Sequence, residues 1–197
     1  MQNVCVYCGS SMGFEGIHQE AAQAFGQTLA ARQLGLVYGA GNVGLMGVVA
    51  NAVLDNGGKV IGVIPQFLKD WEVAHTGLTE LIVTQNMHSR KEKMADLSDA
   101  FVALSGGFGT MDELFEILTW SQLELHQKPI VILNLNGFYD PLLAMVDQLV
   151  KGGFLKSENR DLLLVATSVE AVFEKLASFK AAPLAGKWIE GNPASVR

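Results

Sequence analysis

Short apolar runs rich in Val and Ile alternate with longer amphipathic segments along the chain. Such runs are typical of buried strands, and apolar residues three or four positions apart are typical of helices, so the pattern predicts repeated β–α units. Strands are predicted at Asn3–Tyr7, Leu36–Tyr38, Lys59–Ile64, Leu81–Thr84, Ala100–Leu104, Pro129–Asn134 and, at a sheet edge, Leu162–Ala166. Helices are predicted at Glu15–Leu34, Leu45–Asp55, Asn86–Leu97, Met111–Leu125, Tyr139–Val150 and Val169–Phe179.

Repeated units of this length predict an α/β fold, with a doubly wound parallel sheet and helices on both faces. Residues 1–182 are expected to form a single domain. Residues 183–197 contain several prolines and glycines and are expected to form a loose tail. The segment 66–79 shows neither pattern and is predicted to be irregular, as a lid or part of an interface.

Composition and charge exclude several classes of function. The net charge is −6, which argues against a broad nucleic-acid-binding surface. No basic stretch precedes an apolar run at the N-terminus, which argues against secretion. The uncharged run at 33–54 is long enough to suggest a membrane segment, but a glycine-rich loop interrupts it. We therefore predict a cytoplasmic protein without a membrane partner.

Cys5 and Cys8 have the spacing of a Cys-x-x-Cys motif. A redox pair needs a thiol of low pKa, and a zinc site needs further ligands at similar spacing. The four histidines are scattered along the chain, so buried thiols at the end of the first strand are the favoured interpretation. No metal site is predicted.

The segment Ser105–Glu113 gives the strongest indication of function. It reads Ser-Gly-Gly-Phe-Gly-Thr-Met-Asp-Glu and lies between a predicted strand and a predicted helix. Glycines let the backbone approach a ligand closely, and the first amides of a helix have no partners within the helix. Together with the helix dipole, these amides predict a site for a phosphorylated small molecule.

Two further loops with glycines, Cys8–Gly13 and Gly39–Gly44, also follow predicted strands and are expected at the same sheet edge. Gly39–Gly44 has the Gly-x-Gly-x-x-Gly spacing of dinucleotide sites. However, Pro65-Gln66 stands at the end of the next strand, where such sites have an acidic residue. This loop is interpreted as either phosphate-binding or tightly packed.

Glu113 and Arg90 each have a structural and a functional interpretation. In the structural interpretation, Thr110 and Glu113 form a capping box, and spacing alone favours this. In the functional interpretation, the Glu113 carboxylate reaches a sugar attached to the bound phosphate. Arg90 is one of only four arginines, and it lies either on a solvated helix face or against phosphate and hydroxyl groups. His88 is interpreted either as a proton donor or, as is more common for a lone histidine, as a packed or solvated residue. Asp112 is the other candidate proton donor, and no residue stands out in this role.

Three large side chains could form a pocket for a flat base. They are Trp71, Trp120 and Met87. Core packing is the simpler interpretation of all three.

At these residues the chain resembles the Lonely Guy (LOG) family of cytokinin riboside 5′-monophosphate phosphoribohydrolases, once widely labelled lysine decarboxylases. The specific signatures are Arg90-Lys91 and the Gly-Gly-x-Gly-Thr-x-x-Glu motif at Gly106–Glu113. The resemblance covers nearly the whole chain, from Val6–Ser11 to Gly137–Asp140.

The resemblance implies a Rossmann-like fold, at least a homodimer, and no cofactor. It implies hydrolysis of the N-glycosidic bond of a cytokinin riboside 5′-monophosphate or AMP to the free base and ribose 5-phosphate. The family's essential arginine and glutamate fall on Arg90 and Glu113, which overrides the preference for Glu113 as only a cap. The positions implied to bind substrate are Ser10, Met87, Lys91, Gly106, Gly107, Phe108, Gly109 and Thr110.

Two positions depart from the family's usual pattern. Ser105 stands where the phosphate loop usually begins with proline, and Ala40 interrupts what is usually a run of three glycines. Ser105 could add a hydroxyl donor or loosen the turn. Ala40 is expected to fit only if its φ can be negative.

Two other functions are weighed against hydrolysis. A nucleotide-binding or carrier protein of the same fold would not need a carboxylate beside the ribose, so Glu113 argues against it. A pyridoxal phosphate-dependent decarboxylase needs a buried lysine for a Schiff base. Lys59, Lys91 and Lys128 are all predicted at the ends of elements, and none is placed for that role.

Overall fold

The computed structural model describes residues 1–71 and 74–181. Within these residues, seven strands form one sheet in the order β4-β3-β2-β1-β5-β6-β7, and every pair of neighbours is parallel. The strands are β1 (Asn3–Tyr7), β2 (Gly35–Tyr38), β3 (Val60–Pro65), β4 (Glu80–Thr84), β5 (Ala100–Ala103), β6 (Ile130–Leu133) and β7 (Leu163–Ala166). The helices are α1 (Gly16–Ala31), α2 (Gly44–Asp55), α3 (Gln66–Trp71), α4 (Met87–Asp96), α5 (Phe108–Gln122), α6 (Asp140–Lys151), α7 (Ser157–Arg160) and α8 (Val169–Ser178).

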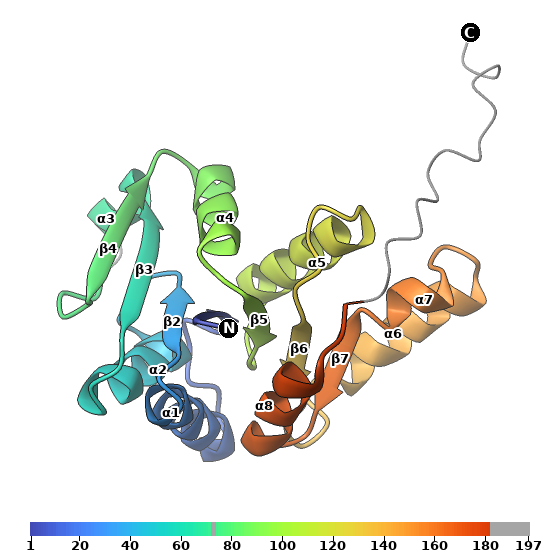
Figure 1. Cartoon of the computed structure of the whole chain (residues 1–197), viewed down its shortest axis with the longest axis horizontal. Helices are drawn as coiled ribbons and strands as arrows, with labels where there is room; N and C mark the ends of the chain where they lie inside the picture. Colours follow the sequence, from blue (N-terminus) through green and yellow to red (C-terminus); the bar gives the residue numbers. More distant parts are fainter. Residues whose placement is uncertain (72–73, 182–197) are drawn as a thin grey trace, which may run out of the picture.

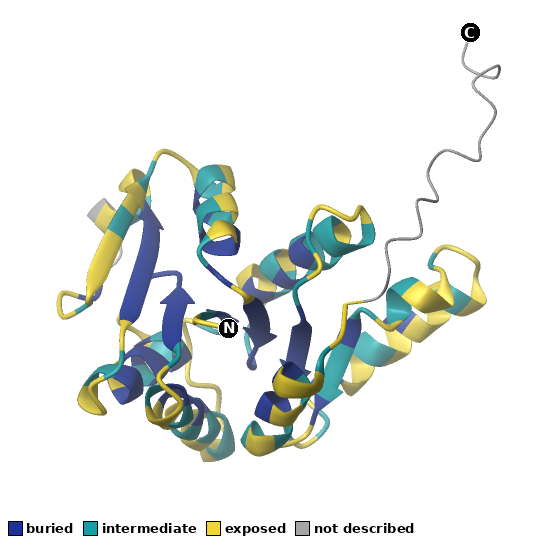
Figure 2. Ribbon diagram, in the orientation of Figure 1, coloured by how far each residue is buried: buried dark blue, intermediate teal, exposed yellow. Residues whose placement is uncertain are grey.

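Helices cover both faces of the sheet (Figure 1). One core cluster joins α1, α2 and α8 to the sheet, with the rings of Phe25 and Phe173 stacked 5.0 Å apart. The other joins α4, α5 and α6, through Met94, Leu114 and Leu143 among others. The strands between these layers are buried, whereas β4 at the sheet edge is largely exposed (Figure 2). The predicted doubly wound α/β fold is confirmed.

All three glycine-containing loops lie at the carboxyl ends of neighbouring strands, as predicted. The order β2-β1-β5 makes their strands adjacent, and the order of connection reverses between β1 and β5. The Gly9 N–H donates to the Ser105 carbonyl at 3.0 Å, and the Met46 N–H donates to the Gly9 carbonyl at 3.3 Å. Ligands of doubly wound sheets bind at such a switch point.

Several element boundaries differ from the prediction. Residues 66–71 form α3 directly after β3, so this part of the segment predicted to be irregular is helical. The short helix α7 was not predicted. Helix α1 ends before Gly35, because Gln33 takes the left-handed conformation (φ 56°) and closes the helix. The predicted Asn86 cap is present: the Ser89 N–H donates to Asn86 Oδ1 at 2.9 Å.

The predicted tail, 183–197, lies outside the described residues. No helix in the described part of the chain is long and apolar enough to cross a membrane.

Candidate active site

A cleft of about 230 Å³ lies at the carboxyl ends of β1 and β2, beside α4 and the N-terminus of α5. It brings together residues from every loop that the sequence indicated. Its lining consists of Val6, Cys8, Gly9, Ser10, Gly39, Met46, Arg90, Gly107, Phe108, Gly109, Thr110 and Glu113. Seven of the ten predicted site residues are in this lining: Arg90, Glu113, Ser10, Gly107, Phe108, Gly109 and Thr110.

Helix α5 begins three residues earlier than predicted, at Phe108, with Gly107 as its N-cap in an extended conformation. No side chain caps this end, so the prediction of a Thr110–Glu113 capping box is wrong. Thr110 is instead buried against the turn, where a Cβ on Gly106 would collide with its side chain. The first amides of α5 are therefore left without side-chain acceptors at the cleft, which suits a phosphate group.

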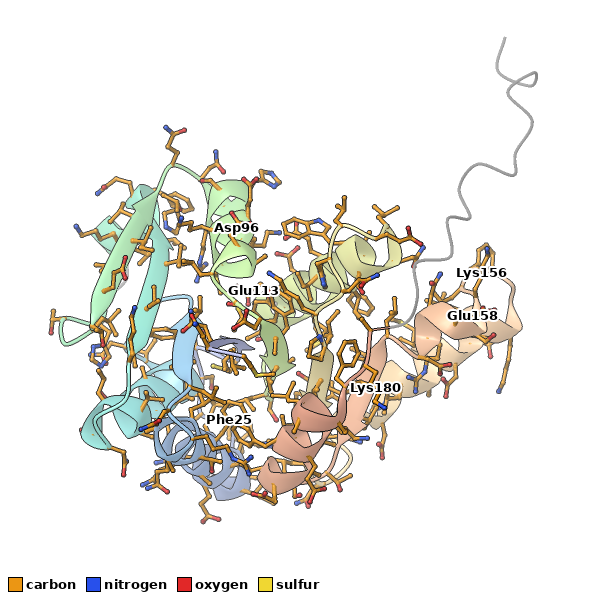
Figure 3. All side chains as sticks on the ribbon, viewed as in Figure 1. Phe25, Asp96, Glu113, Lys156, Glu158 and Lys180 are labelled. Carbon is orange, nitrogen blue, oxygen red and sulfur yellow. The ribbon has the colours of Figure 1, made fainter. Side chains whose placement is uncertain are left out.

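Glu113 lies one turn into α5 at the wall of the cleft, near the ends of the central strands (Figure 3). Burial raises the pKa of its carboxyl group from 4.5 to about 7; the positive charge of Arg90 opposes this shift, and the charge of Asp112 adds to it. A carboxyl group with this pKa is present in both protonation states near neutral pH. It can therefore accept a proton, or oppose a positive charge, without a large free-energy cost.

Arg90 is buried, with 8% of its surface exposed, and the ends of two strands hold it in place. Its Nε donates to the Val63 carbonyl at 3.1 Å, and its Nη2 donates to the Gly39 carbonyl at 2.9 Å. A Cβ at position 39 would collide with the guanidinium in this position, so the glycine leaves room for it. A guanidinium has five donors, so these contacts fix its plane and leave donors for a ligand in the cleft.

Lys91 does not line the cleft. Its ammonium group lies 3.1 Å from Asp112 and 3.0 Å from Glu116, which are both on α5. Burial lowers the pKa of Lys91, but the hydrogen bonds and charges of these carboxylates outweigh it, so the net shift is upward. Lys91 and Asp112 therefore join α4 to α5, and a direct contact of either with substrate remains a prediction.

The remaining predicted residues lie around the cleft rather than in its lining. Met87 contacts the Arg90 guanidinium, with 3.7 Å between its sulfur and Nη1. His88 is exposed on α4, and Trp120 packs against the core cluster under α5. Gly106 belongs to the turn but faces two neighbouring hollows. The side chain of Trp71 lies outside the described part of the structure.

The expectation for Ala40 is wrong, because its φ is +65°, in the left-handed region. Ala40 is fully buried, and its methyl group faces Gly62, where a Cβ would come within 2.7 Å of it. The Ala40 carbonyl accepts a hydrogen bond from the His75 N–H at 3.0 Å. Packing and this bond thus hold a conformation that alanine disfavours by about 1 kcal/mol.

Cys5 and Cys8 are buried free thiols in different core clusters, Cys5 on the α4–α5 side of the sheet and Cys8 on the α1–α2 side. Burial raises the pKa of both thiols, so they are protonated and unreactive. The prediction of structural thiols is confirmed. Among the described residues, no group of three or more His, Cys, Asp or Glu side chains is placed to hold a metal ion.

One contact near the site was not predicted from the sequence. The Ser105 hydroxyl lies 2.8 Å from His18 Nδ1, on the side of the turn away from Glu113. Ser105 was singled out, but nothing in the sequence pairs it with a histidine on α1.

The chain matches the family model described as "Possible lysine decarboxylase" over residues 46–176. It is 45% identical over 176 residues to the rice (Oryza sativa subsp. japonica) protein named probable cytokinin riboside 5′-monophosphate phosphoribohydrolase LOGL1; the match covers 89% of this chain and 79% of that protein. It is 43% identical to the Arabidopsis thaliana cytokinin riboside 5′-monophosphate phosphoribohydrolase LOG5, over 91% of this chain and 78% of that protein.

Two solved structures with the same fold are more distant in sequence. The molybdenum cofactor binding protein of Rippkaea orientalis aligns with a TM-score of 0.69 and 22% identity, over 90% of this chain and 96% of that one. The molybdenum cofactor carrier protein of Chlamydomonas reinhardtii aligns with a TM-score of 0.67 and 21% identity, over 89% and 96% of the two chains. At this identity the likeness establishes the fold alone.

Proposed function

This chain belongs to the LOG family of cytokinin riboside 5′-monophosphate phosphoribohydrolases, and we propose that it hydrolyses the base–ribose bond of a cytokinin riboside 5′-monophosphate or of AMP. The products are the free base and ribose 5-phosphate. The observation that carries this proposal is that Arg90, Glu113 and the uncapped N-terminus of α5 line one cleft.

The phosphate is expected at the N-terminus of α5. The amides of Phe108 and Gly109 and the helix dipole provide a binding site that does not require a basic side chain in contact with the phosphate. With the phosphate there, the ribose lies within reach of Glu113, one helical turn along. Arg90 donates hydrogen bonds to the ribose or phosphate from a guanidinium already held by two carbonyls.

Glu113 supports the reaction at the sugar. As the C1′–N bond breaks, its electron pair leaves with the base and positive charge develops on the ribose. The Glu113 carboxylate opposes this charge more strongly in the transition state than in the ground state. Water then adds to C1′ and gives up a proton, which Glu113 accepts because its pKa is raised to about 7. The departing base takes up one proton from solvent, so that the products are the neutral free base and ribose 5-phosphate.

The lining of the cleft does not suit a pyridoxal phosphate-dependent decarboxylase, although the matching family model carries the lysine decarboxylase description. That reaction needs a lysine amine at the reacting centre. Lys91 is held between two carboxylates, and Lys128 donates to the Ala95 carbonyl at 2.8 Å. No lysine is among the residues that line the cleft.

The enzyme is proposed to act in the cytoplasm as a homodimer. An apolar face supports the dimer: Phe108, Phe138 and Met145 are 97%, 42% and 49% exposed. Phe108 and Phe138 line a hollow of about 350 Å³ together with Met111, Pro141 and Leu142 among others, and Met145 lies one helical turn after Pro141 on α6. Apolar patches of this kind mark protein interfaces. Light scattering should give twice the chain mass for wild type and a smaller mass for Met145→Asp.

The proposal is tested by chromatography of the bases released from AMP and from isopentenyladenosine 5′-monophosphate. Wild type should release free base from at least one of them, and Glu113→Gln should lower kcat by about 10²–10³-fold. Glu92→Gln removes an exposed carboxylate on α4 and serves as the matched control. Tight binding of nucleotide by wild type without release of base would contradict hydrolysis of these substrates and favour a binding protein.

A further inference from the structure

A closed ring of contacts holds the turn that precedes α5 on the side away from Glu113. The Ser105 hydroxyl and His18 Nδ1 lie 2.8 Å apart, at hydrogen-bonding distance. The His18 ring packs edge-on against Phe138, with 5.5 Å between centroids, and Phe138 packs edge-on against Tyr139 at 5.0 Å. The Tyr139 hydroxyl donates to the Leu104 carbonyl at 2.7 Å, one residue before Ser105. The ring therefore closes at the junction of β5 and the turn.

The members of this ring come from three separate parts of the chain. His18 is on α1, Leu104 and Ser105 follow β5, and Phe138 and Tyr139 precede α6. Tyr139 is itself fixed, because its N–H donates to Asn134 Oδ1 at 2.8 Å. The contact between His18 and Ser105 is the one polar side-chain link from α1 to the turn among the hydrogen bonds found in the described residues.

Little freedom remains on the other side of the turn. The Ser105 carbonyl accepts a hydrogen bond from the Gly9 N–H at 3.0 Å. A Cβ on Gly106 would collide with Thr110 and approach the Gly9 nitrogen, so the backbone is closely packed there. Ser105 is thus held through both its carbonyl and its hydroxyl, directly before the amides that are proposed to bind phosphate.

His18 and Ser105 do not touch the proposed substrate site. Both line a separate hollow of about 420 Å³, together with Phe138, and neither is in the lining of the cleft that holds Arg90 and Glu113. The two cavities meet at Gly9, Ser10 and Gly107. A change at His18 or Ser105 that affects a ligand in this cleft is therefore expected to act through the position of the turn.

We propose that His18 is a positioning residue that acts through Ser105 to set the orientation of the phosphate-binding amides at the start of α5. This inference rests on the proposed function, because that function assigns the turn to phosphate. Binding energy that is equal in the ground state and the transition state changes KM and leaves kcat unchanged. Loss of the contact should therefore weaken binding of the phosphate group without slowing the chemical step.

The test measures the Kd of inorganic phosphate and of AMP by calorimetry, and KM and kcat by release of base. His18→Phe keeps a ring against Phe138 but removes Nδ1, and Ser105→Ala removes the hydroxyl from the other end. Each should raise Kd and KM by about threefold to tenfold, the value of one neutral hydrogen bond, with kcat unchanged. His18→Asn places a polar atom near the position of Nδ1 and should restore most of the affinity.

Further measurements separate positioning from a general structural role. The double variant should bind phosphate as weakly as either single variant and no more weakly, because both remove the same contact. A lower Tm with unchanged Kd for phosphate would overturn the inference, and so would a fall in kcat at constant KM.

Failure of the inference can be told from failure of the proposed function. If wild type releases no base from either nucleotide, yet the variants still weaken phosphate binding, hydrolysis of those substrates is wrong and positioning stands. If wild type is active and the variants bind phosphate as it does, positioning is wrong and the proposed function stands. If wild type neither binds phosphate nor releases base, both are overturned.

Discussion

The two sides of the turn at Gly106–Gly107 are built in opposite ways. On the cleft side, burial raises the pKa of Glu113 to about 7, and Arg90 keeps unused donors. Ala40, which follows Gly39 of the cleft lining, is held at φ +65°. On the other side, His18 and Ser105 lie within hydrogen-bonding distance, and the Tyr139 hydroxyl donates to a carbonyl. The features that reduce stability lie where substrate is proposed to bind. The hydrogen-bonded contacts lie on the side of the turn away from Glu113.

This difference shows how the fold maintains a site whose features reduce the free energy of unfolding. A partly desolvated carboxyl group and a left-handed alanine each reduce the free energy of unfolding. They persist because neighbouring contacts hold the backbone in place, such as the bond from the His75 N–H to the Ala40 carbonyl. Substitutions on the cleft side should therefore lower activity strongly or raise stability, whereas substitutions behind the turn should chiefly weaken binding.

The largest effect is expected from Arg90→Gln, which shortens the side chain and removes the charge and the planar fork. We expect kcat/KM to fall by about 10²–10³-fold, because donors positioned at a reacting centre contribute to this extent. Arg90→Lys should recover little, since lysine keeps the charge but cannot bridge the Gly39 and Val63 carbonyls. Kinetics of base release measure the fall in kcat/KM, and a thermal melt checks that each variant is folded.

Arg32→Gln is the matched control for this loss of an arginine. Arg32 pairs with Glu170 at the surface, 2.7 Å away, and is not among the residues that line the cleft. If the activity of Arg90→Gln lay within threefold of this control, Arg90 would have no role in the site. The contrast between the two sides of the turn would then not hold.

A smaller effect is expected on the stability of Glu113→Gln, and it depends on pH. In the unfolded chain Glu113 ionises near 4.5, and in the folded protein near 7, so the folded state holds the proton more tightly between these values. The free energy of unfolding of wild type therefore falls as pH rises from about 4.5 to about 7. The amide that replaces the carboxyl group stays neutral throughout. The Tm of the variant relative to wild type should therefore rise by about 6–12 °C between pH 4.5 and pH 8, because a shift of the pKa from 4.5 to about 7 corresponds to roughly 3 kcal/mol.

The measurement is a set of thermal melts across that pH range, with Glu92→Gln as a variant whose Tm difference from wild type should not vary. A constant Tm difference for Glu113→Gln would show that burial does not penalise the Glu113 charge. On the cleft side, only the left-handed backbone at Ala40 would then reduce the free energy of unfolding.

The smallest effect is expected from Ala40→Gly, which relieves a left-handed conformation but removes a buried methyl group. The relief of about 1 kcal/mol is offset by the lost burial of about 0.8 kcal/mol, so the free energy of unfolding should stay within about 0.5 kcal/mol of wild type. Gln33 has φ 56° at the exposed end of α1 and buries no methyl group there, so Gln33→Gly should stabilise by about 1 kcal/mol. Urea unfolding of both variants measures this difference. Equal stabilisation at both positions would mean that packing around Ala40 contributes nothing.

Patterns within short segments were sufficient to predict most of the fold. The runs Asn3–Tyr7 and Ala100–Leu104 are apolar because central strands are buried on both faces, and this requirement is visible in the residues themselves. The Asn86 cap was also found, since capping depends on neighbours three residues apart. The start of α5 was misplaced, because an extended glycine begins that helix without any capping side chain.

By itself, the sequence determined the order of the seven strands and of six of the eight helices in the described residues. It also determined the glycine-rich turn before α5, and the choice of Arg90 and Glu113 as candidate site residues through the family resemblance. Only the tertiary structure decided that the Glu113 carboxyl has a raised pKa, that Gly39 must leave room for the Arg90 guanidinium, and that His18 meets Ser105. The reason is physical. Helix and strand patterns arise from neighbours a few residues apart, whereas desolvation, collision and hydrogen bonding at this site depend on groups far apart in the chain.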